Sequence, residues 1–116
     1  MLMNYKEERP WGWFEILLEE KDVKVKRILV KEGKRLSLQS HKHRSENWTI
    51  VQGESIITLG TENKQYLRND SVFIPSGTKH RIENSGKGDV IFIEVQTGSY
   101  LGEDDIIRYE DDFDRV

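Results

Sequence analysis

The feature that most constrains the fold of this chain is a succession of short segments in which apolar and polar residues alternate. In VKVKRILV, for example, every second side chain is aliphatic over much of the segment, as expected when a β-strand turns successive side chains to opposite faces. Gly, Asp, Asn, Ser or Lys-rich turns bound each segment, and this close spacing is typical of an antiparallel sandwich or barrel. The segments are WFEILLE, VKVKRILVK, LSLQSHKH, NWTIVQG, ESIITLG, QYLRN, SVFIPS, HRIENS and VIFIEVQ.

Helix content is expected to be small, because no long stretch has a clean period of 3.6 residues. The exception is the tail, GEDDIIRYEDDFDRV, which is predicted to form a short helix or an irregular acidic strap. Its acidic run, Glu103-Asp104-Asp105, is interpreted as a solvated face or a helix N-terminal cap. We therefore predict one all-β domain spanning residues 1–116.

Composition narrows the classes of function. The chain is 35% hydrophobic and 34% charged, and in a small β-domain this polarity fits a pocket for a hydrophilic ligand. A formal net charge of -3 without a basic stripe argues against nucleic-acid binding. The absence of cysteine fits a reducing compartment. The N-terminus has no apolar core of signal-peptide length, and no apolar run is long enough to span a membrane. A cytoplasmic protein is expected.

The histidines have the spacing of metal ligands. His41 and His43 are two residues apart, so on a strand they would share one face, and Glu46 follows three residues later. His80, the remaining histidine, would reach the same ion from a neighbouring strand. A lone strand histidine is more often a surface or hydrogen-bonded residue, but these residues together favour one divalent ion. Imidazole and carboxylate suit Zn, Mn, Fe, Co or Ni.

Two motifs resemble those of the cupin superfamily. NDSVFIPSGTKHRIEN resembles the second cupin motif, in which Pro75 and Gly77 form the turn that delivers His80, and Asn69 stands in a left-handed turn position. GKRLSLQSHKHRSENWTIVQG resembles the first motif, with the usual six residues between Glu46 and its turn glycine. Its histidine pair departs from the commonest spacing on both sides. The resemblance implies a cupin fold, a double-stranded β-helix or jelly-roll barrel.

Longer segments narrow the resemblance to one family. RPWGWFE, KVKRILVKEGKRLSLQSHKHRSENW, IPSGTKHRIENSG and IEVQTGSYLGEDDIIRYEDDFDR together resemble the type II mannose-6-phosphate isomerases, the cupin domain usually found at the C-terminus of bifunctional phosphomannose isomerase/mannose-1-phosphate guanylyltransferases. The resemblance runs from Arg9 to Arg115. This chain has Asn47 where the family usually has His and Asp114 where it usually has Gly. On a strand, Asn47 would point away from the face of Glu46.

The family resemblance implies the interconversion of mannose 6-phosphate and fructose 6-phosphate through an enediol(ate). His41, His43, Glu46 and His80 would hold the metal, which would polarise the carbonyl. Glu94, flanked by apolar strand residues, is the hypothetical proton shuttle because burial would raise its pKa. The alternative for Glu94 is a structural ion pair.

Strand parity provides the remaining site candidates. Lys26 shares a face with Ile28 and should point inward, so it is assigned to catalysis and, with Arg35, to the substrate phosphate. Arg9 and Arg108, which lie in the family-like segments, are further candidate cations. Lys26 and Arg35, the favoured pair, could instead be solvated strand residues. Gln39 shares the predicted face of the histidine pair and is expected to bind a sugar hydroxyl or the metal.

The expected assembly is a homodimer, since pairing covers exposed sheet edges, that acts as a stand-alone isomerase on a hexose phosphate. Two rival hypotheses remain. The first is a non-catalytic metal- and sugar-binding cupin that partners a separate nucleotidyltransferase in polysaccharide precursor synthesis. The second is a metal-dependent oxygenase or another sugar isomerase or epimerase built on the same ligands.

Overall fold

The computed structural model describes residues 5–115, and this part of the chain is built of strands and turns without a helix. It accordingly contains no helix long and apolar enough to cross a membrane. The expectation of an all-β protein is confirmed. The strands are β1 (Tyr5–Arg9), β2 (Gly12–Glu19), β3 (Val23–Val30), β4 (Leu38–Ser40), β5 (Arg44–Gln52), β6 (Ser55–Leu59), β7 (Glu62–Tyr66), β8 (Ser71–Ile74), β9 (His80–Asn84), β10 (Val90–Gly98) and β11 (Ile107–Glu110).

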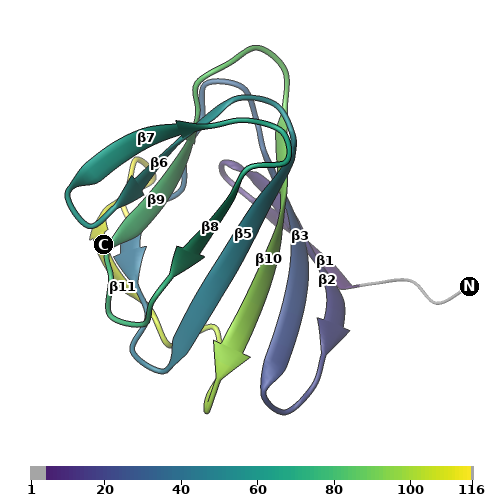
Figure 1. The fold of residues 1–116 in the computed structure, drawn as a ribbon, viewed down its shortest axis with the longest axis vertical. Helices are drawn as coiled ribbons and strands as arrows, with labels where there is room; N and C mark the ends of the chain where they lie inside the picture. The colour runs from purple at the N-terminus through teal and green to yellow at the C-terminus, as the bar shows by residue number, and fades with distance from the viewer. Residues whose placement is uncertain (1–4, 116) are drawn as a thin grey trace, which may run out of the picture.

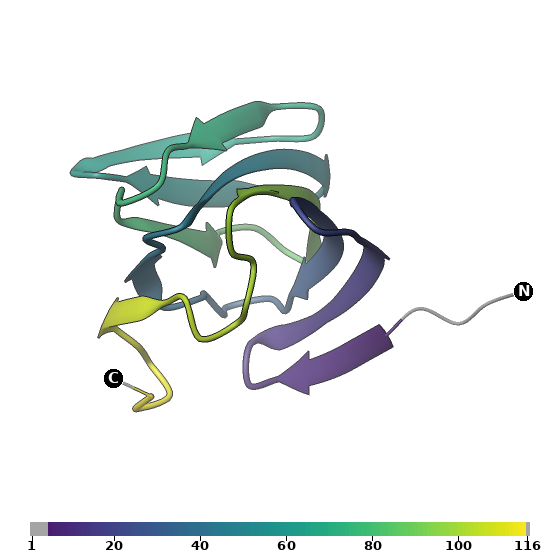
Figure 2. The same ribbon diagram turned by 90° about the horizontal axis from the view of Figure 1, so that it is seen from below.

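The strands form two antiparallel sheets that face each other around a common interior (Figures 1 and 2). The six-stranded sheet has the order β1-β2-β3-β10-β5-β8, and the five-stranded sheet has the order β11-β4-β9-β6-β7. Strand β10 therefore lies between β3 and β5, which are distant from it in sequence. In this register Glu94 is directly opposite Lys26 on one side and Trp48 on the other.

Turns with left-handed backbone lie where the sequence predicts them. Gly77, which follows Pro75, has a φ of 83°, and Asn69 has a φ of 74°. Asp114 stands where the resembled family usually has glycine, and its φ of 58° explains that preference, because glycine adopts this conformation without steric cost. The turn at Gly77 ends immediately before β9, so it sets the position of His80 at the first residue of that strand.

The interior is divided along the strands into an apolar half and a polar half. In β3 the buried positions change from Lys24 and Lys26 to Ile28 and Val30. Strand β10 runs antiparallel to β3 and changes in the opposite direction, from apolar to polar. The apolar half contains the aromatic core, including Trp48 stacked obliquely on Phe92 with ring centroids 4.9 Å apart. The polar half is where a site can be built.

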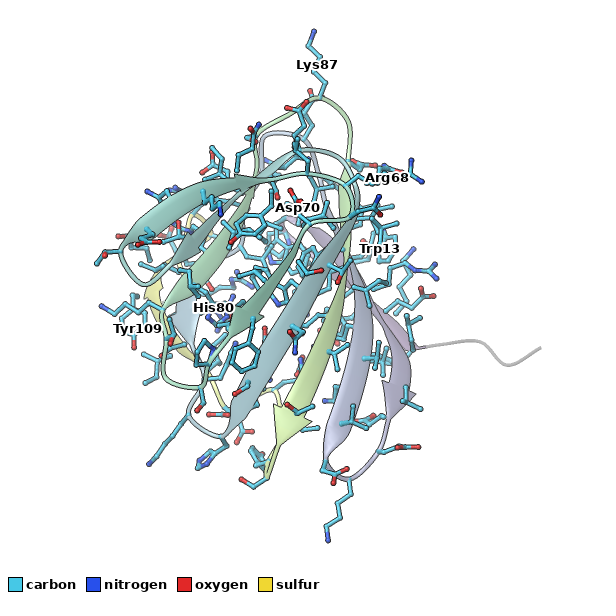
Figure 3. The ribbon with its side chains drawn as sticks, in the orientation of Figure 1. Trp13, Arg68, Asp70, His80, Lys87 and Tyr109 are labelled. Atoms are coloured by element: carbon cyan, nitrogen blue, oxygen red, sulfur yellow. The ribbon has the colours of Figure 1, made fainter. Side chains whose placement is uncertain are left out.

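Three local predictions are wrong. QYLRN, predicted to be a strand, is strand only at Gln65 and Tyr66, where β7 ends. The segment predicted to form a strand from Leu36 to His43 is a strand only over β4, which ends at Ser40. The tail contains no helix within the described residues; it forms β11, which pairs with β4 and so extends the smaller sheet. Figure 3 shows His80 inside the molecule, whereas Lys87 and Arg68 project from its surface.

Candidate metal centre

Three potential ligands converge in the polar half of the interior. His41 follows β4, Glu46 lies in β5 and His80 begins β9, so both sheets contribute. His41 Nε2 lies 3.3 Å from Glu46 Oε2, and His80 Nε2 lies 3.9 Å from Glu46 Oε1. One ligand atom from each residue lies within 4.8 Å of the others. This group of two imidazoles and one carboxylate could hold a metal ion.

Both imidazole rings are held so that Nε2 faces the group. His41 Nδ1 donates to the carbonyl of Asp105 at 2.7 Å, and His80 Nδ1 donates to the carbonyl of Thr78 at 2.9 Å. Burial, reinforced by the charge of Arg44, lowers the pKa of His41 to about 4, and burial also lowers the pKa of His80. The neutral rings thus present Nε2 lone pairs, as metal coordination requires.

The chemistry of these acceptors fits a cation. His80 Nε2 is buried and has no hydrogen-bond partner among the described residues. Arg44 already approaches the other two acceptors, with its Nε 2.7 Å from Glu46 Oε2 and its Nη2 3.2 Å from His41 Nε2. Arg44 was missed in the sequence, although strand parity with Glu46 would have placed it on the inward face.

His43 does not join the group, and the prediction that it shares a face with His41 is wrong. β4 ends at Ser40 and β5 begins at Arg44, so the two histidines lie in a turn rather than on one strand. His43 is exposed, and its ring packs edge-on against Tyr100 at 6.1 Å between centroids. Strand periodicity cannot assign faces within a turn.

Gln39 takes the place predicted for the first histidine of the pair. It is buried on β4, directly opposite His80 in β9, and lines the same cavity. Its amide donates only a long bond, 3.4 Å, to the Ser37 carbonyl. Counting Gln39 and His41 as the pair leaves five residues after Gly33 and four before Glu46, which relieves both departures in the first motif. The spacing therefore contained this information.

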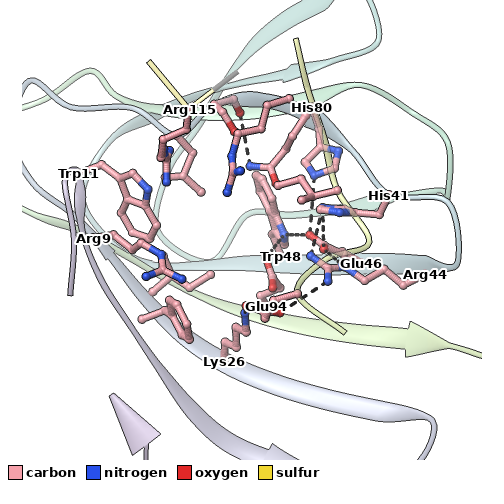
Figure 4. A pocket seen from close by; sticks show the side chains of 18 residues that line it. Arg9, Trp11, Lys26, His41, Arg44, Glu46, Trp48, His80, Glu94 and Arg115 are labelled. Carbon is pink, nitrogen blue, oxygen red and sulfur yellow. Dashed lines mark hydrogen bonds and ion pairs between the residues drawn. The ribbon is translucent and has the colours of Figure 1, made fainter. Parts of the chain in front are cut away.

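A second buried carboxylate lies beside the three potential ligands His41, Glu46 and His80, which we call the metal group. Trp48 Nε1 donates to Glu46 Oε1 at 2.9 Å and to Glu94 Oε1 at 3.0 Å. Burial, reinforced by the negative charge of Glu46, raises the pKa of Glu94 to about 7, although Lys26 opposes this rise. Figure 4 shows Glu94 between the metal group and Lys26. The arrangement offers a carboxylate that can gain and lose a proton near neutral pH.

The segment between β10 and β11 completes this side of the interior (Figure 2). Lys26 Nζ lies 2.7 Å from Glu103 Oε1, so Lys26 points inward as predicted but is paired. The Asp105 carboxylate accepts the backbone N–H groups of Lys42 and His43 at 2.9 and 2.8 Å. The interpretation of residues 103–105 as a helix cap is wrong, because no helix follows them in the described chain. Glu103 and Asp104 are exposed, as expected for a solvated face, but Glu103 also lines the cavity and Asp105 is buried and holds the ligand turn.

Arg35 lies outside this cavity, which corrects its assignment to the substrate phosphate. It forms a two-pronged ion pair with Asp112 through Nε and Nη2 at 2.8 and 2.9 Å, and it lines a separate groove of the smaller sheet. The cavity that contains the metal group has a volume of about 100 Å³. Besides Arg44, the arginines that line this cavity are Arg9, Arg108 and Arg115.

Known proteins resemble this chain in sequence and in fold. The profile of the family described as mannose-6-phosphate isomerase C-terminal matches residues 2–111. Xanthan biosynthesis protein XanB of Xanthomonas campestris is 48% identical over 108 residues, which are 93% of this chain and 23% of that protein. Mannose-1-phosphate guanylyltransferase ManC of Salmonella typhimurium is 44% identical over 114 residues, which are 98% of this chain and 24% of that protein. The chain thus spans about a quarter of these relatives.

A solved structure confirms the fold. An uncharacterized conserved protein with a double-stranded β-helix domain from Klebsiella pneumoniae superposes with a TM-score of 0.74 at 24% identity. The likeness covers 83% of this chain and 82% of the Klebsiella chain. The expected double-stranded β-helix architecture is therefore shown.

Proposed function

This chain belongs to the mannose-6-phosphate isomerase C-terminal family, and from that premise we propose that it is a metal-dependent isomerase that interconverts mannose 6-phosphate and fructose 6-phosphate. The observation that carries the proposal is the position of Glu94. A carboxylate whose pKa is raised to about 7 shares a hydrogen-bond donor with Glu46 of the candidate metal group. A metal and a proton carrier side by side are what an aldose–ketose isomerisation needs.

The metal would be held by His41, Glu46 and His80, with the Gln39 amide oxygen as a candidate fourth ligand. When bound, a divalent ion at these residues would polarise the sugar carbonyl and offset the negative charge of the enediolate. Trp48 and His80 pack edge-on, with ring centroids 5.5 Å apart, so the apolar core supports this side of the group.

Glu94 is proposed to carry the proton between two neighbouring carbons. As a carboxylate it would remove the proton from C2 of open-chain mannose 6-phosphate, and as a carboxyl it would deliver a proton to C1 of the enediolate. The hydroxyl proton of O2 passes to O1 in the same interconversion, so no proton is gained or lost overall. Both forms are accessible near pH 7 because its pKa lies close to that value. Gln96 Nε2, 2.6 Å from Glu94 Oε2, holds the second oxygen and so fixes the orientation of the carboxylate.

Lys26 is proposed to assist this step through its charge. It stands directly opposite Glu94 in the β3–β10 register, and its ammonium lies over the Phe14 ring at 4.1 Å from the centroid. Its pairing with Glu103 holds the ammonium in place beside the cavity. An ammonium fixed in a buried site can stabilise negative charge that develops on the substrate.

The proposal is tested by following fructose 6-phosphate formation from mannose 6-phosphate with protein loaded in turn with Mn, Zn, Co, Fe and Ni. Turnover is expected with at least one ion, and Glu94→Gln should lower kcat by about a hundredfold or more. Glu62→Gln, an exposed change on β7, is the matched control and should leave kcat unchanged. Stoichiometric metal without turnover for any ion would contradict the proposal and favour a sugar-binding module that partners a nucleotidyltransferase.

A further inference from the structure

Three arginines gather at the end of the cavity that lies away from the metal group. Arg9 ends β1, Arg108 lies in β11 and Arg115 follows that strand, so segments far apart in sequence contribute to one end of the cavity. Figure 4 shows Arg9 and Arg115 on the opposite side of the cavity from His41. The cluster has no part in holding the metal or moving the proton in the function proposed above.

The charges of this cluster are not balanced within the described residues. Arg9 is paired with Glu7, and Arg115 is paired with Asp111 through Nε and Nη2 at 2.6 and 3.0 Å. Arg108 has no ion pair in the described part of the chain, and its Nε is buried without a hydrogen-bond partner. Burial, reinforced by repulsion from Arg115 and Arg9, lowers the pKa of Arg108, although the charge of Asp111 opposes this fall. A buried donor left without a partner is costly unless a ligand supplies one.

We propose that Arg108, flanked by Arg9 and Arg115, forms the subsite for the phosphoryl group of a hexose 6-phosphate. A phosphate monoester is a dianion with several acceptor oxygens, and guanidinium groups match its geometry through paired N–H donors. The inference rests on the proposed function for the identity of the sugar, whereas the anion-binding role rests on the arginines alone.

The sheet places this subsite at a suitable distance from the metal group. Arg108 in β11 is directly opposite Gln39 in β4, which is directly opposite His80 in β9. The three residues form one row across neighbouring strands, so Arg108 and His80 are separated by two strand spacings, about 10 Å between backbones. An open-chain hexose 6-phosphate has seven bonds from C1 to phosphorus, about 9 Å when extended with single bonds of about 1.5 Å. The substrate can therefore span the row.

The other cations near the cavity are less suitable for the phosphate. Lys26 is already paired with Glu103, and Arg35 is paired with Asp112 outside the cavity. Arg44 is paired with Glu46 at the metal group itself. Arg108 is thus the arginine of the described cavity lining that has a buried donor without a partner.

Titration calorimetry on the metal-free protein tests the inference, because binding is then measured without turnover. Mannose 6-phosphate and inorganic phosphate are the probes, and unphosphorylated mannose is the reference ligand. Arg108→Gln should weaken binding of mannose 6-phosphate by about tenfold to a hundredfold, the effect of losing a hydrogen bond to a charged group. Arg35→Gln, a matched change outside the cavity, should bind like wild type. Arg108→Lys keeps the charge and should recover part of the affinity.

The outcomes separate this inference from the proposed function. Wild-type affinity in Arg108→Gln, or no binding of either phosphate probe to wild type, would overturn the phosphoryl subsite even if the isomerase is active. Selective loss of phosphate binding in Arg108→Gln supports the subsite even if wild type shows no turnover. Thermal unfolding and metal uptake of each variant show whether its fold is intact, and loss of affinity in an unfolded Arg108→Gln would leave Arg108→Lys to decide.

Discussion

Glu46 and Glu94, on neighbouring strands, accept hydrogen bonds from one donor, the indole nitrogen of Trp48, at 2.9 and 3.0 Å. Both side chains are buried, so their environments decide which of them carries a charge. Glu46 is paired with the Arg44 guanidinium at 2.7 Å, whereas the negative charge of Glu46 helps to raise the pKa of Glu94 to about 7. Glu46 is thereby suited to a cation and Glu94 to a proton.

The raised pKa of Glu94 predicts a specific pH dependence of stability. Because the folded protein holds this proton more tightly than the unfolded chain, the Glu94 contribution to the free energy of unfolding falls as pH rises from about 4.5 to about 7. In the Glu94→Gln variant this pH-dependent loss of stability is absent, because the glutamine side chain does not titrate. Relative to wild type, the variant should gain up to about 3 kcal/mol across that window, at about 1.4 kcal/mol per pKa unit.

Urea unfolding of both metal-free proteins at several pH values measures this difference. His41, whose pKa is lowered to about 4, has the opposite pH effect in both proteins. Because the charge of Glu94 raises the pKa of His41, its removal shifts the His41 titration further down, below the pH window that is compared. Glu62→Gln should follow the wild-type curve, since that side chain is exposed. A constant difference between Glu94→Gln and wild type from pH 4.5 to 7.5 would show that Glu94 has an ordinary pKa.

Metal uptake should depend on His80 and not on His43. His80→Ala removes a buried, unpartnered Nε2 from the ligand group, so metal affinity should fall by more than about a hundredfold, beyond the loss expected for a supporting residue. His43→Ala changes an exposed ring and should retain stoichiometric metal. Elemental analysis after loading and gel filtration measures both. Loss of metal in His43→Ala, with retention in His80→Ala, would reverse the assignment.

Asp105 should support the site without touching substrate. Asp105→Ala removes the acceptor of two backbone N–H groups in the ligand turn, which should lower the free energy of unfolding by about 1–3 kcal/mol. Metal affinity should also fall about tenfold to a hundredfold, because the turn positions His41. Asp104→Ala is the neighbouring exposed control and should change neither property. Unaltered metal affinity in Asp105→Ala would mean that this turn does not set the ligand geometry.

Restoring the histidine usual in the family at position 47 should have little effect. Asn47 is exposed between buried Glu46 and buried Trp48, so a histidine there would point away from the cavity. Asn47→His is therefore expected to leave metal stoichiometry unchanged and to alter kcat less than about twofold. Parallel metal and kinetic measurements check this. A large gain in kcat would indicate that position 47 acts on the reaction through a contact that this structure lacks.

Alternation along single strands was the information that the sequence carried best. It correctly predicted that Lys26 points inward and that Asn47 faces away from the interior. The Pro75–Gly77 turn ahead of His80 was predicted equally well, because its backbone preferences are local. These features depend on residues close in sequence.

The predictions that were wrong concern segments whose conformation depends on contacts with residues distant in sequence. His43 was assigned a strand position, but the chain turns between β4 and β5, where Asp105 from the tail binds its backbone. The tail itself could not be placed from its own sequence, because β11 exists through pairing with β4. Arg9 and Arg108 were candidate cations in the sequence, but their convergence with Arg115 on one cavity could not be recognised before the fold was known.

The central claim, metal-dependent isomerisation with Glu94 as proton carrier, is tested most directly by NMR analysis of the reaction in D₂O. Metal-loaded protein and mannose 6-phosphate should give fructose 6-phosphate with deuterium at C1, because the Glu94 carboxyl exchanges its proton with solvent before returning it. Chelation should abolish product formation, and Glu94→Gln should retain metal but form product at least about a hundredfold more slowly. Absence of fructose 6-phosphate with every metal, or undiminished product formation by Glu94→Gln, would contradict the account.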